Sequence, residues 1–163
     1  MTDTPPDASP ADAQGPGISI QPPLIYAASM LAGIGLNRLW PQAMPFGLHG
    51  PVPAGALLVM VLLLSGFCIR EFHKAGTEVR ADRPDTALIT SGPYCYTRNP
   101  LYIGLTLVQI AVAMYLDNAW ILGMTVASVV VISSYAIRRE ERYLEQQFGQ
   151  DYRDYRQRVR RWL

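Results

Sequence analysis

The chain alternates between four long apolar runs and polar segments that carry most of its charge. The runs hold 17 to 19 residues each, with at most one charged side chain, and cover about 24–40, 52–70, 100–116 and 119–137. A helix needs about 17–25 mostly apolar residues to cross a hydrocarbon core of about 30 Å. Four such runs in 163 residues leave little water-facing surface, so the pattern predicts four transmembrane helices.

A different pattern follows the fourth run. Apolar and aromatic residues recur every three or four positions among charged ones, at Leu144, Phe148, Tyr152, Tyr155, Val159 and Trp162. This spacing predicts an amphipathic helix over 138–163, bent at Gly149, that lies on the membrane surface or over the neighbouring polar segments. The predicted fold class is therefore all-α: a polytopic membrane protein with about four transmembrane helices and a C-terminal amphipathic cytoplasmic helix.

The remaining segments complete the predicted organisation. Residues 1–17 are rich in Pro, Ala and Asp and contain no apolar run, which predicts a disordered tail before a single membrane domain over 18–163. No basic stretch precedes a cleavage pattern there, so a removed signal peptide is not expected. The loop 72–91 is long and lacks periodicity, and its apolar section 86–90 predicts an ordered segment that packs back on the helices.

The basic residues are distributed unevenly between the connections. Five lie in or beside the loop between the second and third runs, and eight arginines follow the fourth run, whereas 41–51 and 117–118 contain none. Because basic residues favour the cytoplasmic side, we expect a multi-pass integral membrane protein with both termini in the cytoplasm. Cys68 and Cys95 then face a reducing compartment, so a structural disulfide is not expected, and no metal-ligand spacing is present.

Three local signals bear on how the helices meet. Small residues recur at helical spacing in the first run, among them Ser29 and Gly33, and they allow close approach of a neighbouring helix. Pro100 suits the first position of the third helix, since a proline lacks the N–H that would be unsatisfied there. Asp117-Asn118 predicts a tight reversal, so the third and fourth helices should form a hairpin.

The segment before the third run gathers polar and aromatic chemistry at a membrane border. Arg98 and Asn99 stand immediately before Pro100, where a helix N-terminus attracts carboxylates and phosphates. Tyr94 and Tyr102 supply flat faces for a purine ring, and Arg98 could orient an anionic group. The alternative is an interfacial belt of aromatic residues with a snorkelling arginine.

Glu140 and Glu141 form a second polar group, just after the fourth run. Adjacent carboxylates could hold a ribose diol, an ammonium or a sulfonium through charge-assisted hydrogen bonds. The alternative is a solvated ladder of ion pairs with the neighbouring arginines. Both groups fall on the same predicted cytoplasmic face, which makes a shared site with Arg98, Glu140 and Glu141 as its catalytic residues a testable hypothesis.

The two segments together resemble a known family. TALITSGPYCYTRNPLYIG, followed one helical hairpin later by RREERYLEQQFGQDYRDYRQRVRRWL, is similar to the isoprenylcysteine carboxyl methyltransferase-like family. These integral-membrane enzymes use S-adenosyl-L-methionine and are related to the phospholipid methyltransferases. The resemblance covers roughly residues 54–163 and rests on the order and spacing of both motifs.

The resemblance implies a set of cofactor-binding residues in this chain. One segment would contact S-adenosyl-L-methionine largely through its backbone, and Tyr94 would line the adenosine pocket. A second segment, matching the family's Arg-His-Pro-x-Tyr motif, would also touch the cofactor, and Glu140 would bind near the cofactor or the substrate head group. The full set is Thr86, Ala87, Leu88, Ile89, Tyr94, Asn99, Pro100, Leu101, Tyr102 and Glu140.

The sequence departs from the family pattern at two positions. Asn99 stands where histidine is commonest, and an amide cannot titrate near neutrality. Ala136 lies one helical turn before Glu140, where the eukaryotic prenylcysteine enzymes carry an arginine thought to engage the substrate. No Gly-x-Gly-x-x-Gly signature of soluble methyltransferases is present either.

The predicted function is S-adenosyl-L-methionine-dependent methyl transfer to a lipophilic or membrane-embedded acceptor at the cytoplasmic membrane face. The acceptor group would be a carboxylate, a thiol or a lipid head group. The expected partners are the lipid bilayer and a lipophilic or prenylated acceptor, with no nucleic acid. The alternatives are a non-catalytic four-helix membrane protein that binds a ligand, or a membrane reductase on a related scaffold.

Overall fold

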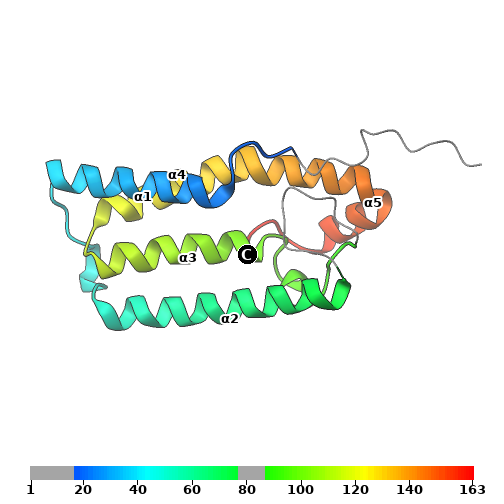
Figure 1. Ribbon diagram of the computed structural model, residues 1–163, viewed down its shortest axis with the longest axis horizontal. Coiled ribbons are helices and arrows are strands. Elements are labelled where there is room, and N and C mark those ends of the chain that lie inside the picture. Colours follow the sequence, from blue (N-terminus) through cyan, green and yellow to red (C-terminus); the bar gives the residue numbers. More distant parts are fainter. Residues whose placement is uncertain (1–16, 77–86) are drawn as a thin grey trace, which may run out of the picture.

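The computed structural model describes residues 17–76 and 87–163, and its regular elements within these ranges are helical (Figure 1). The longer helices are α1 (Pro22–Leu39), α2 (Pro51–Ala75), α3 (Pro100–Tyr115), α4 (Ala119–Ile132) and α5 (Arg138–Arg158). A π-helical turn, η4 (Ser133–Ile137), joins α4 to α5, and two short 3-10 turns are η2 (Pro45–Gly47) and η3 (Gly92–Cys95). The all-α prediction is confirmed for the described residues.

Four of these helices coincide with the predicted apolar runs. Two stretches, α2 and the continuous run from α4 into α5, are long and apolar enough to cross a membrane. Helix α3 is apolar but shorter. Helix α2 continues past the predicted end at residue 70, and it stops where Gly76 takes a left-handed conformation with φ of +67°.

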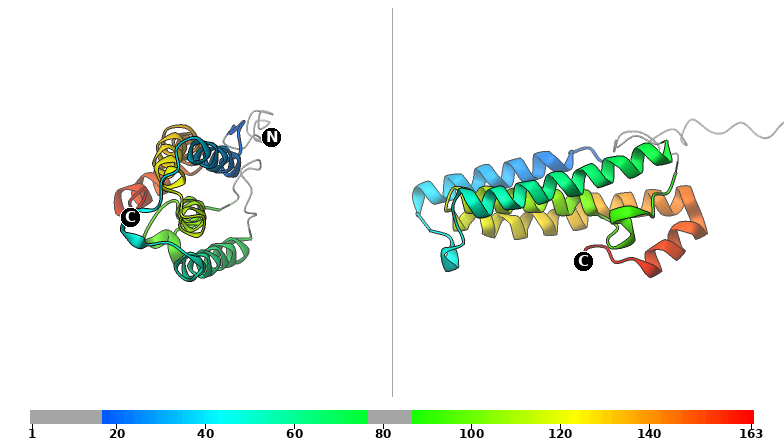
Figure 2. Two further views of the ribbon diagram at one scale, coloured as in Figure 1. Left: turned by 90° about the vertical axis from the view of Figure 1, so that its left-hand side faces the viewer. Right: turned by 90° about the horizontal axis from the view of Figure 1, so that it is seen from below.

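The helices pack as two neighbouring pairs, α2 with α3 and α1 with α4, and α3 also contacts α4 (Figure 2). Polar side chains join three of them: Ser29 lies 2.6 Å from the Ser128 hydroxyl and accepts a hydrogen bond from Gln109 Nε2 at 3.0 Å. Ser128 and Gln109 are almost fully buried. Such bonds between helices hold them in register where water does not compete.

The predicted hairpin between α3 and α4 is confirmed. Asp117 takes a left-handed φ of +47°, which lets the chain reverse between the two helices. The side chain of Asn118 then accepts hydrogen bonds from the backbone N–H groups of Trp120 and Ile121, so it caps the start of α4. Pro100 is the first residue of α3, as its sequence position predicted.

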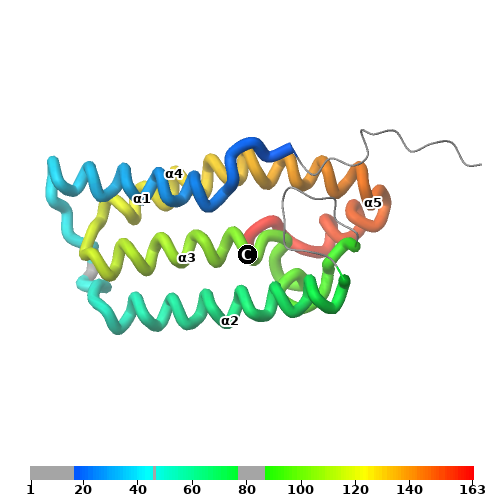
Figure 3. The backbone as a smooth tube through the Cα atoms, in the orientation of Figure 1, coloured from blue at the N-terminus to red at the C-terminus, as the bar shows by residue number. Residues whose placement is uncertain are grey.

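The C-terminal helix is shorter than predicted. It bends at Gly149, as expected, where φ is +55° and ψ is −119°, but it ends at Arg158 instead of reaching residue 163. From Val159 the chain is extended and returns to the start of α3 (Figure 3). The helix prediction was wrong there because the backbone of Arg160 pairs with Thr97 and Arg98 instead of continuing the helix.

Candidate functional site

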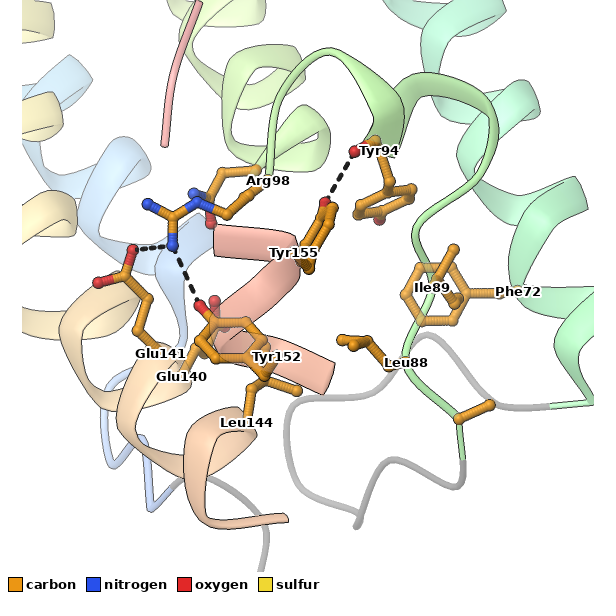
Figure 4. Close-up of a pocket in the computed structure, with 12 residues that line it drawn as sticks. Phe72, Leu88, Ile89, Tyr94, Arg98, Glu140, Glu141, Leu144, Tyr152 and Tyr155 are labelled. Carbon is orange, nitrogen blue, oxygen red and sulfur yellow. Dashed lines mark hydrogen bonds and ion pairs between the residues drawn. The ribbon is translucent and has the colours of Figure 1, made fainter. Parts of the chain in front are cut away.

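A cavity opens beside the start of α3 (Figure 4). Its walls come from the end of α2, the segment before η3, the residues leading into α3 and both arms of α5. The lining residues are Phe72, Ala87, Leu88, Ile89, Tyr94, Arg98, Asn99, Glu140, Glu141, Leu144, Tyr152 and Tyr155. The two polar groups that the sequence analysis paired therefore share one cavity.

Most of the predicted site residues line this cavity. Ala87, Leu88, Ile89, Tyr94, Arg98, Asn99, Glu140 and Glu141 do so. Pro100, Leu101 and Tyr102 are not among the lining residues, and Pro100 and Tyr102 are buried in the first turn of α3. Thr86 lies outside the described residues.

Arg98 and Glu141 form a buried ion pair in the cavity wall. Arg98 Nη1 lies 2.9 Å from Glu141 Oε1, and each side chain is only 10% exposed. The same nitrogen donates to the Tyr152 hydroxyl at 3.2 Å. Arg98 Nε is buried and has no hydrogen-bond partner among the described residues. A buried guanidinium of this kind is stabilised chiefly by its paired carboxylate.

Glu141 is shared between two arginines. Arg161 donates from Nε to Oε1 at 2.9 Å and from Nη2 to Oε2 at 2.6 Å, which is a bidentate contact. Hydrogen bonding to Glu141 also raises the pKa of the Arg161 guanidinium above its ordinary value. Both carboxylate oxygens are thus engaged by side chains of the protein itself.

Glu140 has a separate partner. The Tyr102 hydroxyl donates to Glu140 Oε1 at 2.6 Å, from the first turn of α3 to the first turn of α5. Tyr102 belongs to the buried cluster that also contains Tyr26, Ile132 and Ala136. A packed aromatic ring therefore holds a carboxylate that faces the cavity. The predicted contact of Tyr102 with the cofactor stays a prediction.

Tyr94 is fixed from two sides. Its ring packs edge-on against Phe72, with ring centroids 6.0 Å apart, and its carbonyl accepts a hydrogen bond from the Tyr155 hydroxyl at 2.8 Å. Burial raises the pKa of both tyrosine phenols above the ordinary value, so both remain neutral at physiological pH. Neighbouring Tyr96 is instead 79% exposed, which leaves it outside the site.

Four lining residues were not predicted as site residues: Phe72, Leu144, Tyr152 and Tyr155. Three of them, Leu144, Tyr152 and Tyr155, belong to the apolar residues whose spacing predicted the amphipathic helix over 138–163. The sequence predicted the bend at Gly149 and, as one alternative, a helix lying over the polar segments; the bend does bring the second arm of α5 over residues 94–99. The spacing did not show which side chains would line the cavity, because such long-range contacts leave no local sequence signal.

A glycine holds the turn that carries Tyr94. Gly92 has φ of +60°, and a β-carbon there would lie 2.7 Å from Glu71 Cγ. Glu71 cannot easily move, because it accepts hydrogen bonds from Ser91 and from Lys74. The close approach therefore fixes η3 against the end of α2.

Gly92→Ala is expected to lower the thermal unfolding midpoint more than Gly76→Ala. Both positions have left-handed φ, +60° and +67°, so each alanine costs roughly 1–2 kcal/mol in backbone strain. Only at Gly92 does the added methyl group also meet another side chain, since no heavy atom lies within 4 Å at Gly76. The measurement is thermal unfolding of both variants in the same detergent. If the two midpoints fall by the same amount, the added methyl group at Gly92 does not clash with Glu71.

Comparisons with known proteins identify the family of the chain. Residues 52–151 match the family model described as phospholipid methyltransferase, a range that contains every lining residue except Tyr152 and Tyr155. The predicted resemblance to the isoprenylcysteine carboxyl methyltransferase-like family is thereby confirmed.

Two curated relatives are similar to parts of the chain. An uncharacterized protein of Haemophilus influenzae is 46% identical over 65 residues, which is 39% of this chain and the whole of that protein. The protein-S-isoprenylcysteine O-methyltransferase of Dictyostelium discoideum is 38% identical over 78 residues, 47% of this chain but only 32% of the relative. The chain thus spans about a third of that enzyme's length. With the family model covering well over half of its residues, the chain belongs to the phospholipid methyltransferase family.

Proposed function

We propose that the protein transfers a methyl group from S-adenosyl-L-methionine to a lipophilic or membrane-embedded acceptor at the cytoplasmic membrane face. The observation that carries the proposal is the shared cavity, in which Arg98 and Glu140 face aromatic side chains from a distant part of the chain. Membership of the phospholipid methyltransferase family makes methyl transfer the reaction class. The Dictyostelium relative's name, an O-methyltransferase acting on protein-S-isoprenylcysteine, supports an oxygen atom as one class of acceptor.

The lining residues suit the chemical parts of this cofactor. Tyr94 and Tyr155 offer aromatic faces to a purine ring, and Glu140 offers a carboxylate to ribose hydroxyls or to a positively charged sulfonium. Arg98, in the cavity wall, offers a positive charge to an anionic group of a bound ligand. The bound cofactor would supply an electrophilic methyl group. The protein's part is to orient both reactants and to limit water.

The acceptor should be ionised before it binds. Among the described lining residues no histidine is present, and Glu141 is already engaged by two guanidiniums. A carboxylate or thiolate needs little base catalysis, whereas an amine or hydroxyl must lose a proton during the reaction. The site therefore favours a carboxylate or thiolate over an amine head group.

We infer that α1 to α4 all cross the bilayer and that α5 lies on its cytoplasmic side. Helix α2 and the α4–α5 run are long and apolar enough to do so, and α1 and α3 pack beside them. Large apolar side chains remain exposed on these helices, including Leu62, Leu63 and Val126. Lipid would cover them, and a lipophilic acceptor could reach the cavity laterally between helices.

Binding of S-adenosylhomocysteine tests the cofactor assignment. Titration calorimetry on the detergent-solubilised protein should show saturable binding, and Tyr94→Ala should weaken it by at least about tenfold, or 1.4 kcal/mol. Tyr96→Ala is the matched control, because the Tyr96 ring is 79% exposed. Absence of saturable binding by the unaltered protein would contradict the proposal and leave the reductase alternative.

Turnover separates an enzyme from a binding protein. Purified protein with methyl-labelled cofactor should label one class among prenylcysteine analogues, simple thiols and phosphatidylethanolamine. We expect the first or second class, because these acceptors ionise without a protein base. Binding without labelling of any class, including membrane extract, would support the non-catalytic alternative.

A further inference from the structure

The last five residues of the chain form an extended strap, defined here as Val159–Leu163. The carbonyl of Arg160 accepts a hydrogen bond from the Arg98 backbone N–H at 2.9 Å. The carbonyl of Arg161 accepts from Asn99 Nδ2 at 2.8 Å and from the Thr97 hydroxyl at 3.2 Å. None of the strap residues lines the cavity. The strap therefore supports the Arg98–Asn99 wall without touching the space where a ligand would bind.

The strap is also tied to the turn that leads into α5. Trp162 Nε1 donates to the Ser133 hydroxyl at 3.2 Å, and the Trp162 ring packs against the buried cluster that includes Ile132 and Ile137. Ser133 begins the π-helical turn η4, which directly precedes the helix bearing Glu140 and Glu141. The strap thus contacts both the residues before α3 and the turn that leads into α5, without itself lining the cavity.

Arg161 makes the strongest of these contacts. Its bidentate pair with Glu141 is charge-assisted on both oxygens, and Glu141 in turn pairs with Arg98 at 2.9 Å. Without Arg161, the Glu141 carboxylate would lose the partner that fixes its plane. Arg98 would then lose a fixed acceptor for a guanidinium that is nine-tenths buried.

We propose that Arg161 is a positioning residue for the methyl-transfer site: it holds Glu141, and through Glu141 it holds the Arg98 guanidinium in the cavity wall. The inference rests on the proposed function, since it concerns the same cavity. It also assigns Glu141 a role different from that of Glu140. Glu141 orients an arginine, whereas Glu140 faces the ligand.

The test compares S-adenosylhomocysteine affinity in three variants of the full chain. Arg161→Gln should weaken binding by about tenfold or more, because it removes the bidentate contact that orients Arg98. Arg161→Lys should recover only part of the affinity, since a lysine places a point charge where a planar fork is needed. Arg158→Gln is the control, because Arg158 is exposed and its side chain donates to the Asp154 carbonyl in its own helix. Unchanged affinity in Arg161→Gln would overturn the proposal.

A double-mutant cycle shows whether Arg161 acts through Glu141. Glu141→Gln should weaken binding to a similar degree, and the double variant should bind about as well as either single variant. If the losses in binding free energy of the two single variants add in the double variant, Arg161 does not act through Glu141 and the proposal is wrong. A general loss of stability would lower the unfolding midpoint of Arg161→Gln and Arg161→Lys alike, without the graded recovery of affinity.

A ligand-free measurement separates this inference from the cofactor assignment. In a Trp40→Phe, Trp120→Phe background, Trp162 is the sole tryptophan and reports on the strap by its fluorescence. Arg161→Gln should increase quenching of Trp162 by acrylamide, as the strap leaves Ser133. If the unaltered protein fails to bind S-adenosylhomocysteine but quenching rises, the proposed function falls and the strap contact stands. Unchanged quenching overturns the inference itself.

Discussion

Glu140→Gln is expected to lower the rate of methyl transfer by about 10²-fold, the loss typical when one preorganised electrostatic partner is removed from an active site. The amide keeps the shape of the carboxyl and can still accept the 2.6 Å hydrogen bond from Tyr102. The change removes the negative charge and keeps the shape of the side chain, so it tests the charge and not the packing. The measurement is the initial rate with methyl-labelled cofactor and the acceptor that the screen identifies.

Tyr102→Phe tests the positioning of Glu140 without removing its negative charge. The phenylalanine ring should remain in the buried cluster, while Glu140 loses a charge-assisted hydrogen bond of about 1.5–3 kcal/mol. We expect a smaller loss, about tenfold in rate, with Tyr96→Phe as an unaffected control. Full activity of Glu140→Gln would show that its carboxylate has no part in the reaction.

The sequence predicted the cavity's two walls because each is continuous in the chain. The 87–99 segment and the Glu140–Glu141 pair could be recognised by residue type, by their place at a membrane border and by their spacing within a known family. The partners of these residues could not be predicted. That Glu141 binds Arg161 depends on the bend at Gly149 and the returning strap, and that Glu140 binds Tyr102 depends on how the starts of α3 and α5 meet.

The helices were predictable to within a few residues because apolar runs and prolines mark them directly. The end of α5 was not, because the amphipathic spacing continues through Val159 and Trp162 while the backbone leaves the helix. Spacing predicts which side chains are buried, but the hydrogen-bond partner of the backbone is chosen by tertiary structure. Here the competing partners are the backbone and side chains of residues 97–99.

The predicted close approach of small residues in the first run is confirmed at Gly33. A β-carbon at this position would lie 2.8 Å from Ile121 Cα and 2.9 Å from Ile121 N, so α1 and α4 touch through their backbones. Atoms of a helix backbone cannot yield as a flexible side chain can. Adding one methyl group must therefore push the two helices apart or shift one along the other.

Gly33→Ala is accordingly expected to destabilise the protein by about 1–3 kcal/mol, the range for overpacking a well-packed contact. Gly35→Ala is the matched control in the same helix, since no heavy atom lies within 4 Å of its β-carbon position. There the alanine should stabilise by up to about 1 kcal/mol through better helix propensity. Thermal unfolding of both variants in the same detergent should show a lower midpoint for Gly33→Ala and an unchanged or higher midpoint for Gly35→Ala. A gain in stability at Gly33 would mean that α1 and α4 are not in backbone contact in the folded protein. Because Ser29 bonds to Ser128 and Gln109 one turn away, we also expect the displaced helix to weaken that polar network.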